Sequence, residues 1–285
     1  MTWDETPGTA VVTGASSGIG AEYARRLAGR GWDLVLVARR AERLAALADR
    51  LRGETGAAVE TVEADLARSA DLARIAERVA APDVALLVNN AGINGYGPFP
   101  EVDAALLTKV VDVNVVAPTV LTRAAVPGML ARGRGAVVNV ASLLAFAGSL
   151  PPGPLPQRAV YGGTKGYVVT FTRTLAAELA GTPVRLQVVC PGLTATEFHL
   201  GTGERPVPGE QRVHEDGGMP VADVVTASLA ALAAGEVVCV PGLEDTEAVA
   251  RLVAAELGVR EGAGTSLAPR YRAAAEAAAE AETDG

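Results

Sequence analysis

Tyr161 and Lys165 are the residues of this sequence best suited to acid–base chemistry, because they stand four positions apart on a predicted helix. Side chains with this spacing share one helix face, and an ammonium near a phenol lowers the pKa of the tyrosine. The chain has 25 basic residues but lysine only at positions 109 and 165, which indicates that position 165 needs a compact ammonium. We expect Tyr161 to exchange a proton with substrate near neutral pH, and Lys109 to be a solvated surface residue.

A glycine-rich turn indicates a second function, the binding of a dinucleotide. Directly after the first predicted strand, the chain reads Thr13-Gly14-Ala15-Ser16-Ser17-Gly18-Ile19-Gly20 and then opens a helix. The free N–H groups and the dipole at such a helix start attract a pyrophosphate, and the glycines permit a tight turn and close approach of the backbone. The residues expected to contact the cofactor here are Gly14, Ser16, Ser17, Gly18, Ile19 and Gly20.

A series of short motifs follows this turn in a fixed order. They are Asp65-Leu66, Asn89-Asn90-Ala91-Gly92, Asn114, Ser142, Tyr161-x-x-x-Lys165, and Pro191-Gly192 with Thr196. Together with the turn, whose pattern is TGxxxGxG, these seven matches resemble the compact, non-extended branch of the short-chain dehydrogenase/reductase family. The resemblance covers residues 9–258, and each match falls at the carboxyl end of a predicted strand or in the helix beyond it.

The resemblance implies a role for each matched residue. Tyr161 would donate a proton to a substrate carbonyl oxygen, and Ser142 would hydrogen-bond that oxygen. Lys165 would also hold the nicotinamide ribose, and Asn114 would position a water that relays protons, although it could instead be a satisfied buried amide. Asp65 would hold the adenine and Thr196 the carboxamide. The other positions implied to contact the cofactor are Leu66, Asn90, Ala91, Gly92, Pro191, Gly192 and Thr194, beside Tyr161 and Lys165 themselves.

The end of the second predicted strand indicates which dinucleotide binds. A carboxylate there would bind the 2′-hydroxyl of NAD, whereas a cation would accept the 2′-phosphate of NADP. The sequence is Val37-Ala38-Arg39-Arg40, with no acid in place, so Arg39 favours NADP(H). Ser17 stands where some NADP-binding relatives carry a second basic residue, and an NAD-preferring dehydrogenase is the alternative.

The substrate is expected to be a small molecule with a carbonyl or secondary alcohol group. The predicted pocket residues are Ser142, Leu144, Tyr161 and Phe198, with Tyr96 and Phe146 nearby. Leu143 to Val160 is longer than in relatives and contains four prolines, so an irregular loop should cover a largely apolar pocket. An epimerase or dehydratase using the same site remains open, and a non-catalytic dinucleotide-sensing protein is the less favoured reading.

The elements that position these residues alternate between strands and helices. This predicts an α/β fold with a doubly wound (Rossmann-type) parallel seven-stranded sheet and helices on both faces. The strands are expected at Thr9–Thr13, Asp33–Ala38, Ala58–Glu63, Val84–Val88, Ala136–Ala141, Val184–Cys190 and Val237–Val240. The helices are expected at Gly18–Arg30, Ala41–Arg52, Ala70–Ala80, Asp103–Arg132, Val160–Ala180, Val221–Ala233 and Thr246–Leu257. One domain should span residues 1–260, with a lid loop at 197–220 and an Ala/Glu-rich tail at 261–285.

Composition narrows the classes of function. The chain has 285 residues, 49% of them hydrophobic, and a formal charge of −8. This excludes a disordered protein, and the acidic balance argues against nucleic-acid and anionic-membrane binding. We find no run of about eighteen apolar residues and no signal-like N-terminus, so a cytoplasmic location is expected.

Two further expectations concern metals and assembly. Cys190 and Cys239 end valine-rich runs and are interpreted as buried hydrophobes, while His199 and His214 lack ligands at metal-site spacing, so no metal is predicted. The helices at Asp103–Arg132 and Val160–Ala180 are too apolar to be left uncovered, which favours a homodimer or homotetramer.

Overall fold

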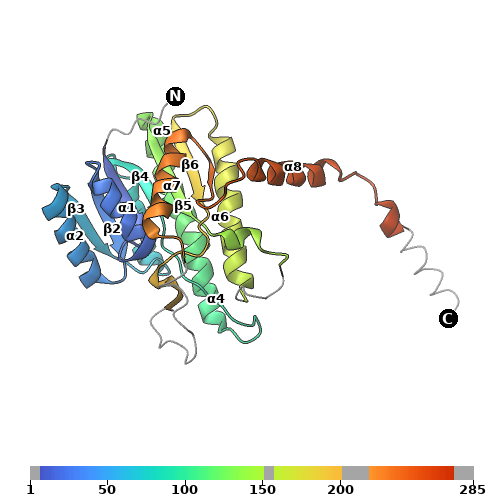
Figure 1. Cartoon of the computed structure of the whole chain (residues 1–285), viewed down its shortest axis with the longest axis horizontal. Coiled ribbons are helices and arrows are strands. Elements are labelled where there is room, and N and C mark those ends of the chain that lie inside the picture. Colours follow the sequence, from blue (N-terminus) through green and yellow to red (C-terminus); the bar gives the residue numbers. More distant parts are fainter. Residues whose placement is uncertain (1–6, 151–156, 201–217, 273–285) are drawn as a thin grey trace. The chain divides into compact units, whose positions relative to one another are not determined.

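The protein forms one parallel sheet flanked by helices (Figure 1). The computed structural model describes residues 7–150, 157–200 and 218–272. Within them the strands are β1 Thr9–Thr13, β2 Asp33–Ala38, β3 Val59–Glu63, β4 Val84–Asn89, β5 Gly135–Val140, β6 Val184–Val189 and β7 Val238–Cys239. Their spatial order is β3-β2-β1-β4-β5-β6-β7. The predicted seven-stranded, doubly wound fold is therefore confirmed.

The strand sequences explain this arrangement. Every residue of β1, β4 and β5 is buried, as expected for continuous Val, Leu and Ala runs in a sheet covered on both faces. β3 lies at the sheet edge, and its Glu60 and Glu63 are exposed. Charged side chains on an edge strand discourage pairing with another sheet.

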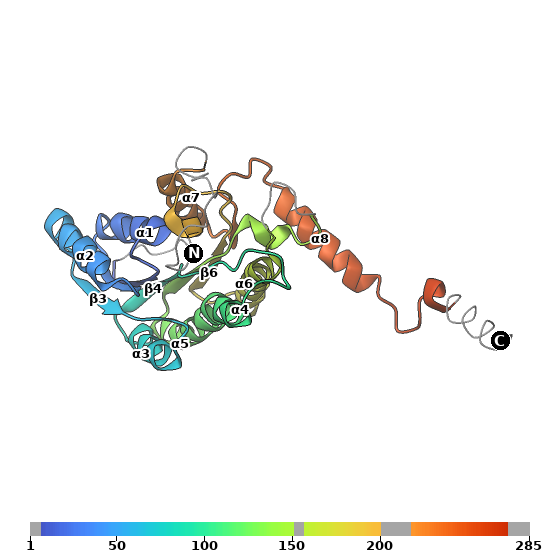
Figure 2. The ribbon, with the colours of Figure 1, turned by 90° about the horizontal axis from the view of Figure 1, so that it is seen from below.

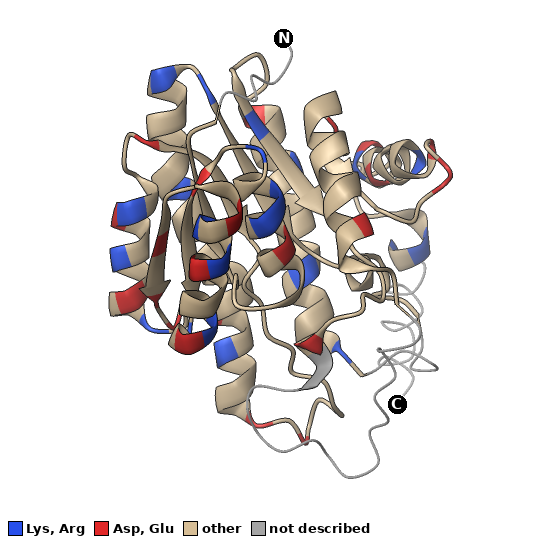
Figure 3. Ribbon diagram, turned by 60° about the vertical axis from the view of Figure 1, so that its left-hand side comes forward, with Lys and Arg blue, Asp and Glu red and all other residues tan. Residues whose placement is uncertain are grey.

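The helices cover both faces of the sheet. They are α1 Gly18–Ala28, α2 Ala41–Thr55, α3 Ser69–Val79, α4 Ala104–Val111, α5 Ala117–Arg132, α6 Ala159–Glu178 and α7 Val221–Ala234. Figure 2 shows α1, α2 and α7 on one face and α3, α5 and α6 on the other. One apolar core packs under each group, with Leu27 and Leu229 in the first and Ile75 and Leu121 in the second. In the view of Figure 3, basic and acidic residues are interspersed along the ribbon.

The strand order reverses beside β1, which pairs with β2 on one side and β4 on the other. In open parallel sheets, ligands bind outside the carboxyl ends of the strands at such a switch point. The glycine turn follows β1, and the Asn89-Asn90-Ala91-Gly92 motif begins at the end of β4. The topology therefore brings these motifs to one crevice.

The segment predicted as one helix at Asp103–Arg132 is interrupted. A π-helical turn, Asp112–Val116, separates α4 from α5, and the Ala117 N–H donates to the Asp112 carbonyl, five residues back. Pro118 supplies a reason, because it has no N–H to donate to the carbonyl of Asn114, four residues before it. The prediction of a regular helix is therefore wrong at Asn114.

The same segment corrects the expectation that no stretch could cross a bilayer. Ala104–Arg132 is 29 residues long and apolar enough to span a membrane by length and composition. In this structure Ala117, Leu121, Ala125 and Met129 of α5 are buried in the core beneath the sheet, as in the core helix of a globular domain.

By its contacts the chain divides into two compact units, residues 1–242 and 243–285. The second contains α8, Ala248–Glu261, which was expected at Thr246–Leu257. The boundary at residue 260 stays a prediction. Most of the predicted lid, 201–217 with His214, lies outside the described residues, while Glu197–Leu200 form a short 3-10 helix.

Candidate active site

Tyr161 lies in the first turn of α6, and Lys165 follows one turn later on the same face. The two side chains are 5% and 4% exposed, so both belong to the protein interior. The Lys165 Nζ donates to the Val140 carbonyl at the end of β5 over 2.9 Å and lies 5.6 Å from the centre of the Tyr161 ring. The predicted pairing of the two residues on one helix face is therefore found.

The expected lowering of the Tyr161 pKa is not found. Burial raises the pKa of Tyr161 above its usual value, and the neighbouring Tyr96 phenol adds to this effect. Burial also lowers the pKa of Lys165 to about 8. Loss of water is the largest cause of the change in each pKa. Tyr161 is consequently a neutral acid at neutral pH.

Ser142 follows β5 and caps the short 3-10 helix Leu143–Phe146. Its hydroxyl accepts from the Leu144 N–H over 3.2 Å, and it also lies in hydrogen-bonding reach of the Tyr161 hydroxyl. The cap accounts for the position of the serine, because an extended residue at a helix start presents its oxygen to the first free N–H groups. Ser142 and Tyr161 therefore face the same point in the crevice.

Asn114 lies in the π-helical turn and is 1% exposed. Its side chain accepts from the Ile93 N–H over 3.0 Å and donates to the Ile93 carbonyl over 3.0 Å. It also donates to the Thr164 hydroxyl over 3.1 Å, and that hydroxyl donates to the Tyr161 carbonyl over 2.8 Å. The side chain thus ties the loop after β4 to α6, as a satisfied buried amide. The water-positioning role of Asn114 stays a prediction.

Asn90 holds the glycine turn in place. Its side chain donates to the Thr13 carbonyl over 2.9 Å and to the Gly14 carbonyl over 3.3 Å. Gly14 has φ +66°, and a Cβ there would lie 2.8 Å from the Asn90 Nδ2, while a Cβ at Gly20 would lie 2.5 Å from it. No other residue type fits at either position. The turn therefore brings backbone against the start of α1, the arrangement that accommodates a pyrophosphate.

Asp65 and Lys109 form an ion pair across 44 residues, Lys109 Nζ to Asp65 Oδ2 over 3.0 Å. Burial alone would raise the pKa of Asp65, but the hydrogen bonds from Lys109 and from the Ala67 N–H bring it below the usual value. The prediction that Lys109 is only a solvated surface residue is wrong. Asp65 lies where adenine is expected, after β3, and Leu66 beside it is buried.

Arg39 and Arg40 follow β2, and both are exposed. Arg39 forms no ion pair with the other described residues, but its charge helps to lower the pKa of Asp65. Arg40 turns back over the glycine turn and donates to the Ser16 and Ser17 hydroxyls over 2.9 and 2.6 Å. Sequence reasoning did not include this contact, since Arg40 carries no motif of its own.

The segment after β6 crosses the crevice. A Cβ at Gly18 would lie 3.1 Å from Thr196 Cγ2, whereas Phe198 packs 5.8 Å from the centre of the Tyr161 ring. The Asn94 side chain donates to the Phe198 carbonyl over 3.1 Å. The segment thus reaches from the glycine turn to Tyr161. Its other predicted cofactor contacts, Pro191, Gly192 and Thr194, lie between β6 and this crossing.

The predicted substrate side of the crevice is largely aromatic. The Tyr96 ring packs edge-on against Tyr161 at 5.3 Å, and burial raises the pKa of Tyr96 to about 12. A Cβ at Gly92 would lie 3.4 to 3.8 Å from Asn114, Lys165 and Phe198, so this glycine borders the same space. Leu144 is half-buried, but Phe146 is 39% exposed.

Titratable residues elsewhere do not form a metal site within the described ranges, where no group of three His, Cys, Asp or Glu side chains converges. Cys190 and Cys239 are both buried, and burial raises the pKa of each thiol to about 12. They act as the small core residues that the sequence predicted.

Comparison with known proteins identifies one family. The model of the short chain dehydrogenase family matches residues 8–205. Galactitol 2-dehydrogenase (L-tagatose-forming) of Cereibacter sphaeroides is 41% identical over 199 residues, which is 69% of this chain and 75% of that protein. A short chain dehydrogenase of Pseudocercospora fijiensis is 38% identical over 195 residues, 67% of this chain, and the chain spans only 60% of that relative's length.

Solved structures are similar over a greater length. A short-chain dehydrogenase of Sphingobium yanoikuyae in complex with NADPH superposes with a TM-score of 0.83 at 36% identity, covering 93% of this chain and 100% of that one. The bulky-bulky ketone specific alcohol dehydrogenase of Comamonas testosteroni gives 0.80 at 33% identity, covering 93% and 98%. A Burkholderia phymatum short chain dehydrogenase/reductase in complex with NAD gives 0.73 at 26% identity, covering 94% and 99%.

Proposed function

This chain belongs to the short-chain dehydrogenase/reductase family, oxidoreductases that act on CH–OH groups, and from that premise we propose that it is an NADP-dependent enzyme interconverting a ketone and a secondary alcohol. The observation that carries the proposal is the convergence of Tyr161, Ser142 and Lys165 beside an open glycine turn. An acid, a second hydroxyl and a cation at one point suit proton exchange with a carbonyl oxygen.

In this mechanism the side chains orient the substrate oxygen and move one proton. A bound nicotinamide dinucleotide supplies the hydride for reduction or accepts it in oxidation. The Tyr161 hydroxyl donates its proton to the oxygen as negative charge develops there, and Ser142 hydrogen-bonds the same oxygen. Tyr161, whose pKa burial raises, is neutral near pH 7 and so carries the proton that carbonyl reduction needs.

Lys165 and Asn114 support this proton transfer indirectly. The Lys165 ammonium, held by the Val140 carbonyl, provides a positive charge that stabilises the Tyr161 phenolate left after proton transfer. Asn114 fixes the loop at Ile93 and, through Thr164, the first turn of α6. The carbonyl of Asn114, which Pro118 leaves without its α-helical donor, is suited to hold the predicted proton-relaying water.

The proposed substrate is a ketone with apolar substituents. The Tyr96 and Phe198 rings pack against the Tyr161 ring, and the half-buried Leu144 follows Ser142, to whose hydroxyl its N–H donates. The similarity to a bulky-bulky ketone specific alcohol dehydrogenase is consistent with this choice. The similarity to galactitol 2-dehydrogenase (L-tagatose-forming) would instead favour a polyol as the substrate. An apolar wall gives little binding energy to hydroxyl-rich ligands, because their polar groups would lose water without replacement.

NADP is proposed over NAD because of the positive charge at the end of β2. Arg39 stands there without an acidic neighbour at position 38, and guanidinium–phosphate hydrogen bonds are among the stronger polar contacts. Similar solved structures hold either cofactor, NADPH in the Sphingobium yanoikuyae enzyme and NAD in the Burkholderia phymatum enzyme.

A spectrophotometric screen tests the function. The enzyme would be incubated with NADPH or NADH and a panel of aryl ketones, aliphatic ketones and ketoses, and cofactor absorbance would be followed. Turnover of an apolar ketone with NADPH is expected. Product analysis by NMR would separate net reduction from epimerisation, which leaves the cofactor unchanged. Turnover of ketoses alone would contradict the proposed substrate class. An isomerised product formed without net consumption of cofactor would contradict the proposed reaction.

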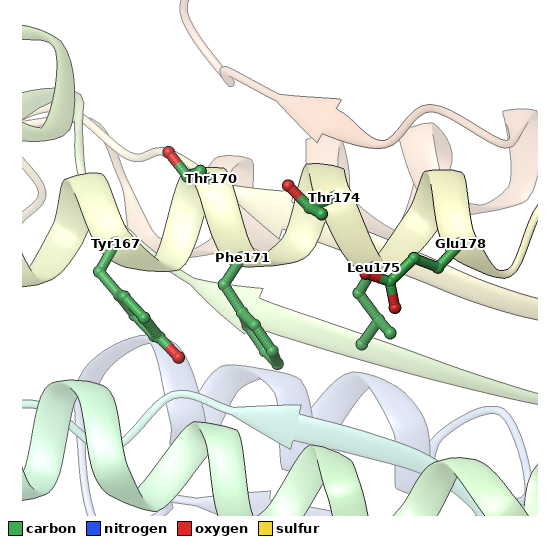
Figure 4. Close-up of a pocket in the computed structure, with 6 residues that line it drawn as sticks. All are labelled: Tyr167, Thr170, Phe171, Thr174, Leu175 and Glu178. Carbon is green, nitrogen blue, oxygen red and sulfur yellow. The ribbon is translucent and has the colours of Figure 1, made fainter.

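We also propose that the protein is a homo-oligomer assembled through α5 and α6. Val116, just before α5, is 40% exposed, Val120 of α5 is 36% exposed, and Tyr167 of α6 is 38% exposed. A shallow depression on α6 is lined by Tyr167, Thr170, Phe171, Thr174, Leu175 and Glu178. Figure 4 shows the Tyr167 and Phe171 rings projecting side by side from one face of the helix, where they stack 5.7 Å apart. Apolar surface of this kind is typical of an interface.

The cytoplasmic location stays a prediction.

A further inference from the structure

Glu197 forms an ion pair with two arginines of a different part of the chain. Its Oε2 accepts from Arg43 Nη1 over 2.6 Å and from Arg40 Nη1 over 3.2 Å. Arg40 donates at the same time to the Ser16 and Ser17 hydroxyls. Two guanidinium groups therefore meet one carboxylate, and one of them also bonds to two serine hydroxyls. The hydrogen bond with Arg43 holds the pKa of Glu197 below its usual value.

This cluster lies at the adenosine end of the crevice. Ser16 and Ser17 belong to the glycine turn after β1, and Arg40 and Arg43 belong to the start of α2, which follows β2. The end of β2 is where a dinucleotide presents its 2′-substituent in this type of sheet. Glu197 reaches this point because Thr196, next to it, packs on Gly18.

The donors around the carboxylate have the chemistry of a phosphate site. Arginine forks and hydroxyls are the side chains that most often bind phosphate oxygens, and their charge-assisted hydrogen bonds are the strong ones. Oxygens of a carboxylate can substitute for those of a phosphate at such donors. Arg40, Arg43 and Glu197 are all about half exposed, so a ligand can reach them from solvent.

We propose that Glu197 is an internal competitor for the 2′-phosphate of NADP, occupying the Arg40–Arg43 site and so setting how strongly the enzyme discriminates NADP from NAD. This inference rests on the proposed function, since it assigns a determinant of its cofactor preference. A 2′-phosphate that binds there must displace the carboxylate from both arginines. A cofactor without the phosphate leaves the ion pair intact. Glu197 therefore reduces affinity for one cofactor and not for the other.

Titration of simple nucleotides isolates the effect. Affinities for 2′,5′-ADP and for 5′-ADP would be measured by calorimetry at low ionic strength for the wild type and for Glu197→Gln. The variant keeps the size of the side chain and loses its charge. Affinity for 2′,5′-ADP is expected to rise about fivefold, the scale of one partly exposed ion pair, while that for 5′-ADP stays the same. The gain should shrink at 0.5 M salt, where charges are screened.

Glu42→Gln is the matched control. Glu42 stands on α2 between Arg40 and Arg43, is exposed, and pairs with neither arginine among the described residues. The substitution changes the net charge equally and should leave the ratio of the two affinities unchanged. In the double variant Glu197→Gln with Arg43→Gln, the gain in affinity for 2′,5′-ADP should be lost.

The outcomes separate this inference from the cofactor proposal. Weaker or unchanged binding of 2′,5′-ADP by Glu197→Gln would overturn the inference, and so would an equal gain for both nucleotides or an equal gain in Glu42→Gln. A wild type that binds NADH as tightly as NADPH would contradict only the proposed NADP preference, because a selective gain for 2′,5′-ADP in Glu197→Gln would still show competition.

Discussion

The Lys165 ammonium lies 5.6 Å from the centre of the Tyr161 ring and donates to the Val140 carbonyl, not to the phenol oxygen. The lysine therefore places its charge beside the tyrosine ring without bonding to the hydroxyl. Its fixed position at the end of β5 keeps that charge in the crevice while leaving the phenol hydroxyl available to Ser142, Tyr96 or a substrate oxygen.

Replacing Tyr161 with Phe should remove proton transfer and little else. We expect kcat for ketone reduction to fall about a thousandfold, within the usual contribution of general acid catalysis. NADPH affinity should be retained, because the hydroxyl acts on the substrate oxygen. Steady-state kinetics and fluorescence titration of NADPH measure the two quantities. Substantial activity with bound cofactor would show that another group donates the proton.

Lys165→Met should stabilise the protein and abolish its activity. The folded-state pKa of Lys165 is about 8, below the usual 10.5, so between these values the unfolded chain binds more protons and wild-type stability rises with pH. At pH 7 the variant should be more stable by about 1–3 kcal/mol, since a buried charge is costly. The difference from the wild type should narrow as the pH rises from 8 to 10. Urea unfolding of both proteins would measure this, and a constant difference would contradict the assignment.

Thr164→Val should disturb the catalytic helix through the lost link between Asn114 and the Tyr161 carbonyl. Thr172→Val is its control, because Thr172 is also buried on α6, accepts from Asn139 and donates to the Val168 carbonyl. Each variant should lose about 1–3 kcal/mol of stability, the cost of a buried unsatisfied partner. Only Thr164→Val should lower kcat at 25 °C, with KM for NADPH unchanged. Equal kinetics in the two variants would mean that Thr164 has only a structural role.

Arg39→Ala tests the NADP preference directly. Loss of a guanidinium–phosphate contact should weaken NADPH binding about tenfold or more, as for a charge-assisted hydrogen bond, and should leave NADH binding nearly unchanged. Titration of both cofactors gives the ratio. An unchanged ratio would mean that Arg39 is a surface arginine at the start of a helix.

Val120→Asp should weaken assembly through the exposed face of α5. Its side chain is 36% exposed, so the aspartate is tolerated by the isolated subunit, whereas at an interface it would be buried without a partner. Light scattering at micromolar concentration should show an oligomer for the wild type and a smaller species for the variant. Leu252→Asp, at a comparably exposed apolar position of α8, serves as the control. A monomeric wild type would refute the proposal.

The fold and the motif positions were predictable because they depend on patterns local in the sequence. Continuous apolar runs define buried strands, and β1 and β2 occupy the predicted residues. The helix interruption at Asn114 had one signal in the sequence, Pro118, four residues later. The apolar periodicity of the segment conceals the interruption, because one wider turn barely changes that periodicity.

Long-range pairings could not be predicted in the same way. Asp65 and Lys109 are 44 residues apart, and Arg40 and Glu197 are 157 apart. Nothing in either local sequence indicates its partner, because the contact exists only once several βα units have packed. The pKa of Tyr161 shows the same limit. The lysine four residues away was evident in the sequence, but the burial that raises the pKa depends on residues from other segments, such as Tyr96 and Phe198.

The π-helical turn at Asp112–Val116 limits where the chain can gain or lose residues in evolution. Such a turn holds one residue more than the α-helix allows, so it is equivalent to a single-residue insertion that was kept. Deleting one residue there would let the helix close regularly without turning α5 relative to α4, because the wider turn already absorbs the extra residue. The deletion would remove the turn that holds Asn114, whose side chain bonds to Ile93 and Thr164. Length variation among descendants of this sequence should therefore be confined to the loops and absent from residues 112–116.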